Sequence, residues 1–416
     1  MKYAKPLIVF FLFASITSCE KTDFILKKTT KTVYIVLDGI PADIIEKVNT
    51  PNIDAIASEG GFAQEKIGGE KGEYTESPTI SAVGYNCILT GTWAVKHNVW
   101  DNTMQDPNYH YKNIFRLLKE SNPEKTIGIF SSWEDNRTKL VGEGLSEAGN
   151  IFFDYHFDGL EFDTENYPHD PKKDYMRRID SAVTDAASEA IRNNAPDLSW
   201  VYLEYTDDIG HLYGDGPKFN RAVMGADEFV GKIWDAVKYR EKNFNEDWLI
   251  IVTTDHGRLA NGGYSHGGQS ARERTGWIST NAKNLNDRFT NSHATIVDIM
   301  PTIARFMNID IPLKSLREID GVPLIGELSL THPTVQLNHN NALIQWHAKA
   351  QTGKVKIYMA TTNHFKNGGK DEYTLMEQVP VKDGQVSINL KNIQSSFYKF
   401  YLEGIDNGCN HWYFRE

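Results

Sequence analysis

The feature that most constrains this chain is a strongly apolar segment, Leu249–Val252, which ends shortly before Asp255 and His256. Its β-branched and aliphatic residues predict a buried strand. Open α/β sheets place their chemistry at the carboxyl ends of such strands. A glycine-rich segment, 262–268, follows and contains a second imidazole, His266. Because oxygen and nitrogen donors are the ligands of zinc-like cations, these residues together predict a metal site.

Two further expected strands also run into candidate ligands. Residues 31–37 end at Asp38, and residues 199–205 lead to Asp207 and His211. Taken alone, Asp38 fits an ordinary turn, and the other two residues fit a polar loop with a helix cap. If a helical turn begins there, their four-residue spacing lets both side chains bind one cation.

The segment 73–91 places serine and threonine hydroxyls before an apolar helix. The positive end of a helix dipole favours an anion beside such a hydroxyl. An ordinary capped helix gives the same pattern. This segment therefore indicates a catalytic site only in combination with the three segments that carry candidate ligands.

In their order along the chain these segments resemble the alkaline phosphatase superfamily, and within it the bacterial type I phosphodiesterase/nucleotide pyrophosphatase branch. The resemblance spans residues 31–325 and includes family-like pieces at Lys96–Val99, Val297–Thr302 and Asp320–Leu324. It implies a mostly parallel sheet flanked by helices and two divalent metal ions, usually zinc. It also implies hydrolysis of a small phosphate ester or pyrophosphate through a phosphoseryl intermediate.

Carried over position by position, the resemblance assigns three protein ligands to each ion, which leaves open positions for catalysis. One ion would be bound by Asp207, His211 and His266. The other would be bound by Asp38, Asp255 and His256, together with the oxygen of the nucleophile. We favour His266 over His293 because His293 precedes residues 294–297, which read as the start of a helix.

The nucleophile implied by the resemblance is Ser81, counted back from Thr90-Gly91, and Thr79 remains the alternative. A serine is a poor nucleophile near neutral pH unless it is activated. A bound metal ion makes its alkoxide available without a dedicated base, so no Ser-His-Asp triad is required.

Three departures limit what the resemblance implies about the substrate. Relatives commonly carry an asparagine three residues after the nucleophile, where this chain has Gly84; Asn86 or backbone amides could substitute. Residues 81–85 lack the proline and arginine of a sulfatase signature, which argues against sulfatase activity. No arginine marks a monoester clamp, so we favour a diester or pyrophosphate. A phosphomonoesterase or phosphotransferase, and a non-catalytic surface binding protein, remain the alternatives.

Composition sets broader bounds. With 416 residues, 40% of them hydrophobic, the chain can bury a large core in more than one domain. A net charge of −11 argues against a basic nucleic-acid groove. It leaves room for a nucleotide held by metal and aromatic stacking. Candidate stacking residues are Trp100, Trp133, Tyr155 and Tyr213.

The N-terminus is typical of a secretory signal. Two lysines precede a short apolar run, Pro6–Ala14, and a lipobox-like sequence ends at Cys19. We therefore expect residues 1–19 to be a lipoprotein signal peptide and residues 20–30 a tether. The mature protein would be anchored to the cell envelope, at the periplasmic or outer-membrane surface. Cys87 and Cys409 fall in different predicted domains, so we expect no structural disulfide.

Two folded parts follow the tether. Residues 31–330 are expected to form the catalytic α/β domain, with helices at 179–192 and 221–236 and substrate-facing loops across 101–171. Residues 335–416 are expected to form an accessory all-β sandwich, immunoglobulin- or fibronectin-like. Its alternating segments are 343–348, 355–360, 385–390 and 397–402.

Overall fold

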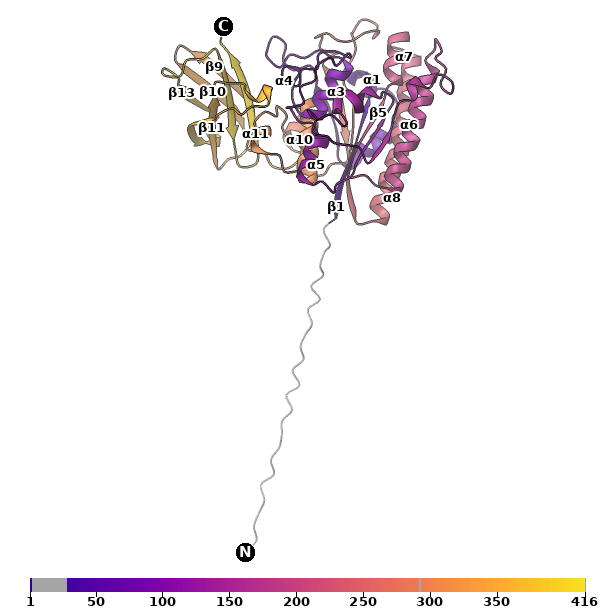
Figure 1. Cartoon of the computed structure of the whole chain (residues 1–416), viewed down its shortest axis with the longest axis horizontal. Helices are drawn as coiled ribbons and strands as arrows, with labels where there is room; N and C mark the ends of the chain where they lie inside the picture. Colours follow the sequence, from indigo (N-terminus) through magenta and orange to yellow (C-terminus); the bar gives the residue numbers. More distant parts are fainter. Residues whose placement is uncertain (2–27, 292, 416) are drawn as a thin grey trace.

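The computed structural model describes residue 1 and residues 28–291 and 293–415. The predicted lipobox with Cys19 lies outside these residues. Within the described part of the chain, no helix is both long and apolar enough to cross a membrane. An α/β domain occupies one side of the molecule and a β-rich domain the other (Figure 1).

The α/β domain is built on one eight-stranded sheet. Its order is β4 (Tyr155–Phe157), β3 (Ile127–Ser131), β5 (Leu198–Leu203), β1 (Thr29–Leu37), β6 (Glu246–Thr253), β7 (Thr275–Thr280), β2 (Gly61–Lys66) and β8 (Ala294–Thr295). β7 alone runs against its neighbours β6 and β2, whereas the other adjacent pairs are parallel. The predicted mostly parallel sheet is therefore confirmed.

Helices cover both faces of this sheet because its central strands are apolar on both sides. On β1, Val33, Ile35 and Leu37 enter one core, while Tyr34 and Val36 enter the other. The first face carries α1 (Ala42–Ile45), α2 (Pro51–Glu59), α6 (Asp174–Asn193), α7 (Tyr205–Tyr213) and α8 (Pro217–Asn243). The second carries α3 (Ser81–Thr90), α4 (Ala94–His97), α5 (Ile114–Ser121) and α10 (Ile299–Met307).

Short elements complete the chain. They are the π-helix Asn136–Val141, the helices α9 (Asp287–Thr290) and α11 (Leu313–Leu316), and the 3-10 turns Leu160–Phe162, Ile296–Asp298, Phe365–Asn367 and Val381–Asp383.

Two sequence-based boundaries need correction, and one region contains elements that were not predicted. The predicted strand 199–205 ends at Leu203, because Tyr205 already begins α7. The region 101–171, which was expected to carry loops, also contains α5 and the sheet strands β3 and β4. Its polar residues belong to the connections, whereas β3 is short, apolar and buried along its whole length. At 294–297 a short strand and a 3-10 turn precede helix α10.

The C-terminal region is a sandwich of two antiparallel sheets, as predicted. One sheet has the order β13 (Gln385–Asn389), β10 (Asn341–Ala348), β9 (Leu330–Asn338). The other has the order β12 (Thr374–Pro380), β11 (Lys354–Ala360), β14 (Phe397–Glu403), β15 (Gly408–Phe414). Apolar side chains from both sheets meet in one core. Alternation in the sequence identified β10, β11, β13 and β14, but not β9, β12 and β15.

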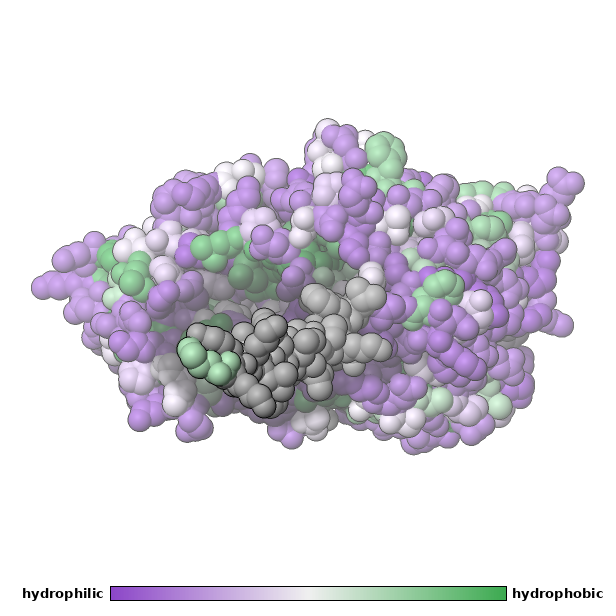
Figure 2. Space-filling model, turned by 90° about the horizontal axis from the view of Figure 1, so that it is seen from below, coloured by the Kyte–Doolittle hydropathy of each residue, from purple (hydrophilic) through white to green (hydrophobic). Residues whose placement is uncertain are grey.

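Buried ion pairs join the sandwich to the α/β domain. Lys96 of α4 lies 2.6 Å from Asp320 and donates a hydrogen bond to Asn410 of β15. Lys399 of β14 lies 2.7 Å from Glu318. Helices α3, α5 and α10 lie between the sheet and the sandwich (Figure 1). Most of the surface in Figure 2 is hydrophilic, with hydrophobic residues gathered in a recessed area near its middle.

Candidate metal centre

Three neighbouring strands bring the candidate ligands to one edge of the sheet. β1 lies between β5 and β6, and the register pairs Leu37 with Leu203 and Val36 with Thr253. The residues that follow these three strand ends must therefore lie close together. Asp38 follows β1 and Asp255 follows β6.

A fully buried group of ligands forms around Asp38, Asp255 and His256. The Nε2 atom of His256 lies 3.3 Å from Asp38 Oδ1 and 3.3 Å from Asp255 Oδ2. The Gly39 amide donates a 3.0 Å hydrogen bond to Asp255 Oδ1, which ties the two strand ends together. Gly39 has φ +66°, and a Cβ there would lie 2.6 Å from Asp207 Oδ1, so this turn requires glycine.

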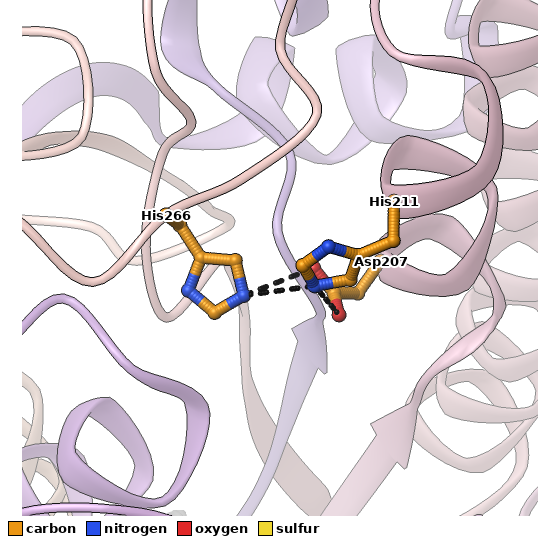
Figure 3. A group of neighbouring side chains, drawn as sticks. All are labelled: Asp207, His211 and His266. Atoms are coloured by element: carbon orange, nitrogen blue, oxygen red, sulfur yellow. Dashed lines mark hydrogen bonds and ion pairs between the residues drawn. The ribbon is translucent and has the colours of Figure 1, made fainter.

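A second, more open group contains Asp207, His211 and His266 (Figure 3). Asp207 and His211 lie one turn apart on α7, and their Oδ2 and Nε2 atoms are 3.1 Å apart. His266 reaches in from the glycine-rich loop, with its Nε2 atom 3.1 Å from His211 Nε2. Its ring stacks on that of His256 with centroids 3.6 Å apart, so the two groups adjoin each other.

All three imidazoles are oriented in the same way. The Nδ1 atoms of His211, His256 and His266 each lie 2.9 Å from a backbone carbonyl, those of Tyr264, Gly257 and Thr79 respectively. A carbonyl can only accept, so each Nδ1 carries a proton and each Nε2 is directed at the carboxylates. Two neutral rings of this tautomer, His211 and His266, face each other with lone pairs, an arrangement that a proton or a metal ion between them stabilises.

In each of the two buried carboxylates, only one of the two oxygens accepts hydrogen bonds from the described residues. Asp255 Oδ1 accepts from Gly39, and Asp38 Oδ2 accepts from Tyr85 and Tyr202. The other oxygens, Asp38 Oδ1 and Asp255 Oδ2, are buried and accept no hydrogen bond from the described residues. Buried polar atoms rarely stay unpaired, and these two point to the same place. The donor set therefore fits a divalent cation such as zinc.

Electrostatics agree with this fit. Burial disfavours a charged imidazole, yet the carboxylates of Asp255 and Asp38 raise the pKa of His256 to about 9. In the open group, burial and the neighbouring His256 lower the pKa of His266 to about 4, whereas the bond to Asp207 raises the pKa of His211. These buried acids therefore favour a positive charge beside them, which a bound divalent cation would supply.

The two candidate hydroxyls differ in their contacts. Ser81 is the first residue of α3, and its Oγ lies 3.4 Å from His256 Nε2. The Thr79 hydroxyl is fully buried, donates to the Gly268 carbonyl and accepts from the Gly267 amide. Thr79 therefore holds the loop that carries His266, while Ser81 lies beside the buried group.

Comparison with known proteins now adds to this geometry. The family model described as type I phosphodiesterase / nucleotide pyrophosphatase matches residues 32–284, more than half of the chain. The chain belongs to this family. Human ectonucleotide pyrophosphatase/phosphodiesterase family member 7 is 23% identical over 241 residues, which cover 55% of this chain and 47% of the relative. The bis(5'-adenosyl)-triphosphatase ENPP4 of Pongo abelii is 21% identical over 309 residues, covering 72% and 59%.

Among solved structures, a 2-O GAG sulfatase superposes with a TM-score of 0.50 at 12% identity. The superposition covers 93% of this chain and 85% of the sulfatase. At this identity the likeness shows the shared fold alone. The chain spans about half the length of the first curated relative it matches.

In this member of the phosphodiesterase family, the structure brings together all six predicted ligands and Ser81. Other expected residues lie elsewhere. His293 lies beside His332 of the sandwich, with ring centroids 5.5 Å apart, and lines a cavity of about 870 Å³ between the domains. Asn86 is buried and faces a small cavity with Tyr109 and Tyr111, so it does not replace the missing asparagine.

The aromatic candidates for nucleotide stacking also separate. Trp100 is 43% exposed, whereas Trp133 is partly buried against the core and lies edge-on to Tyr85. Tyr155 packs against the core of the opposite face, and Tyr213 lies under Lys218.

Several supporting residues escaped the sequence analysis. Arg258 is fully buried and its NH1 atom lies 2.5 Å from Asp207 Oδ1, behind the ligand. Asn102 accepts a 3.0 Å hydrogen bond from the Ala82 amide at the start of α3. Arg258 follows His256 closely in sequence, which was a usable signal. Asn102 is distant from its partner in the chain and gave none.

Proposed function

We propose that this protein is a metal-dependent phosphoric ester hydrolase, a phosphodiesterase or nucleotide pyrophosphatase that acts through a phosphoseryl intermediate at a two-zinc site. The observation that carries the proposal is the convergence of three imidazole Nε2 atoms and two unpaired buried carboxylate oxygens beside the Ser81 hydroxyl. Family membership supports the reaction class.

In this proposal each group of three ligands holds one divalent ion. When bound, the ions lower the pKa of coordinated oxygens and stabilise charge on the attacking and leaving oxygens. Ser81 Oγ attacks phosphorus, and the bond to the leaving oxygen breaks as the Oγ–P bond forms. Water then attacks the phosphoserine, which releases the phosphoryl product and returns a proton to Ser81.

The start of α3 is the place where we expect the phosphoryl oxygens to bind. Helix N-terminal amides favour anions, and Ser81 occupies the first position of the helix. The side-chain oxygen of Asn102 accepts a hydrogen bond from the Ala82 amide. The side-chain nitrogen of Asn102 has no hydrogen-bond partner among the described residues. We propose that this nitrogen supplies the phosphate contact for which relatives use an asparagine at the position of Gly84.

Close packing explains why Gly84 itself cannot do this. A Cβ at that position would lie 2.6 Å from the backbone oxygen of Asp255. Arg258 cannot act as a monoester clamp either, because it is fully buried behind Asp207. The lack of an arginine clamp favours a diester or pyrophosphate over a monoester.

The deciding experiment compares four chromogenic substrates with and without a chelator. They are p-nitrophenyl phosphate, bis-p-nitrophenyl phosphate, p-nitrophenyl thymidine monophosphate and p-nitrophenyl sulfate. We expect zinc-dependent turnover of the two diesters, weaker turnover of the monoester and none of the sulfate. A dominant monoesterase activity would shift the assignment to a phosphomonoesterase. If protein that binds two zinc ions hydrolyses none of the phosphorus esters, the enzymatic proposal fails. The remaining hypothesis is then a non-catalytic binding protein.

We also propose that the chain is attached to the cell envelope through a lipid on Cys19. The lipobox-like sequence before this residue supports the proposal. Wild-type protein should fractionate with membranes, and Cys19→Ser should not. Equal fractionation of the two would exclude the anchor without affecting the enzymatic proposal.

A further inference from the structure

Two tyrosines from different elements converge on a single oxygen of Asp38. Tyr202 lies on β5, next to β1, and its hydroxyl donates a 2.7 Å hydrogen bond to Asp38 Oδ2. Tyr85 lies on α3 and donates a short hydrogen bond to the same atom. Both side chains are essentially fully buried. A buried tyrosine hydroxyl can donate its hydrogen bond to any nearby backbone carbonyl. Here both hydroxyls donate instead to the same oxygen of Asp38, a predicted metal ligand, and this arrangement needs an explanation.

The two hydrogen bonds give the two carboxylate oxygens of Asp38 different roles. Oδ2 accepts two donors, while Oδ1 accepts none from the described residues and lies 3.3 Å from His256 Nε2. A carboxylate held in this way cannot rotate to offer both oxygens to one ion. Charge-assisted hydrogen bonds also stabilise the anion in a site without access to water.

Tyr85 has a second consequence because of its position on α3. It follows Ser81 by four residues, so both side chains lie on the same face of the helix. The hydrogen bond from Tyr85 therefore connects α3, which carries the proposed nucleophile Ser81, to the end of β1, which carries Asp38. Aromatic neighbours fix its ring: Tyr202 at 4.9 Å, Trp200 at 6.0 Å and Trp133 at 6.4 Å between centroids.

We propose that Tyr85 and Tyr202 are positioning residues that hold Asp38 as a one-oxygen metal ligand, and that Tyr85 also sets the distance between that ligand and Ser81. This inference rests on the proposed metal-dependent function. Neither tyrosine touches the substrate. Residues that orient metal ligands typically change metal affinity by about 10- to 100-fold when they are replaced.

The test measures zinc affinity by competition with a chromophoric chelator, using metal-free full-length protein. The variants are Tyr85→Phe, Tyr202→Phe and the double variant. Tyr34→Phe is the matched control: its ring stacks on Trp200 at 5.9 Å, and its buried hydroxyl has no described partner. We expect zinc binding about 10- to 100-fold weaker in each clamp variant and unchanged in the control.

Cobalt absorption provides a readout that a general loss of stability would not move. The substitutions are repeated in a His211→Ala background, which removes one ligand of the open group. Release of Asp38 Oδ2 lets both oxygens bind, so the double variant should show weaker visible bands, as expected for a higher coordination number. Bands and affinities equal to those of Tyr34→Phe would overturn the clamp.

Activity at saturating zinc separates the two roles. Tyr85→Phe should lose more turnover than Tyr202→Phe, because only Tyr85 connects to α3. Equal losses would overturn the coupling through Tyr85. If wild-type protein binds no metal, the proposed function fails; if it binds zinc and hydrolyses diesters while the clamp variants match the control, only this inference fails. Thermal unfolding of the metal-free variants verifies that each one folds.

Discussion

At the residue scale, the two candidate nucleophiles, Ser81 and Thr79, differ in their hydrogen-bond partners. Thr79 uses its hydroxyl in two hydrogen bonds to the backbone of the loop that carries His266, whereas the Ser81 hydroxyl lies beside His256. A hydroxyl with two backbone partners is poorly placed to attack a substrate.

Replacement of the nucleophile gives the first prediction. Ser81→Ala should reduce diester turnover by on the order of 10³-fold or more, because removing a covalent nucleophile leaves only binding and electrostatic effects. Zinc stoichiometry should remain at two, since each ion keeps three protein ligands. Thr79→Val is the comparison: it should lose much less turnover, and added zinc should restore part of that loss. Reversed losses would make Thr79 the nucleophile.

A second prediction concerns His97, which is fully buried. Burial lowers its pKa to about 3, and its Nδ1 accepts a 3.1 Å hydrogen bond from the Val99 amide. The unfolded chain therefore binds more protons between about pH 3 and 6.5, so stability falls as pH falls through this window. His97 contributes up to about 1.4 kcal/mol per pH unit there.

The measurement is the free energy of unfolding in urea at several pH values between 5 and 7.5, in the presence of a chelator. His97→Gln should be less stable at neutral pH but should show a shallower dependence on pH than wild type. Parallel pH profiles for the two proteins would show that His97 is not responsible for the acid sensitivity.

At the scale of elements, the close approach of α3 to the end of β6 places Ser81 beside the candidate ligands. Gly84 lies against the Asp255 backbone without space for a side chain. This contact explains a sequence feature that had no explanation before: a glycine in the interior of a helix is otherwise unfavourable by about 1 kcal/mol relative to alanine.

Gly84→Ala should therefore destabilise the protein and weaken zinc binding, because the new methyl group pushes Asp255 away from its position. Gly225→Ala is the matched control: this glycine lies in α8, and a Cβ there meets nothing within 4 Å. The control should gain about 0.5–1 kcal/mol in stability. Thermal unfolding and zinc titration of both variants make the comparison. A stabilised Gly84→Ala with normal zinc affinity would contradict the contact.

At the scale of the whole molecule, the β-sandwich is fastened to the α/β domain by buried charges. Lys399 lies 2.7 Å from Glu318 and 2.8 Å from Asp371, and its side chain is 1% exposed. Glu318 and Asp320 follow α11, between the two domains in sequence, and Lys96 of α4 pairs with the latter. The sandwich therefore contacts α4, the helix that follows α3 in the chain.

Lys399→Met should cost about 3–5 kcal/mol of unfolding free energy, because it removes the buried cation that pairs with the carboxylates of Glu318 and Asp371. Lys356→Met is the control on the same domain: this lysine pairs with Glu403 near the surface, and its loss should cost less than about 1 kcal/mol. Urea unfolding at neutral pH measures both values. Equal small losses would indicate that the interface contributes little to stability.

The sequence predicted the fold class, and the structure confirmed it. Apolar strands that alternate with helical stretches specify a covered parallel sheet, and alternating segments specify a sandwich. Region 101–171 carries connecting loops, but its elements α5, β3 and β4 were not predicted, because β3 is too short to stand out among polar connections. β9, β12 and β15 were missed where solvent-facing residues interrupt the alternation.

What the sequence determined by itself is the local chemistry: strands that end in acids, an acid and an imidazole at helical spacing, and a hydroxyl before an apolar helix. Only the tertiary structure decided which hydroxyl is free, which nitrogen of each imidazole faces the acids, and why residue 84 is glycine. The physical reason is that most of these properties depend on strand order and on contacts between segments far apart in the chain, such as Thr79 with Gly268 and Gly84 with Asp255. A local pattern specifies a donor, whereas the packed sheet specifies what that donor meets.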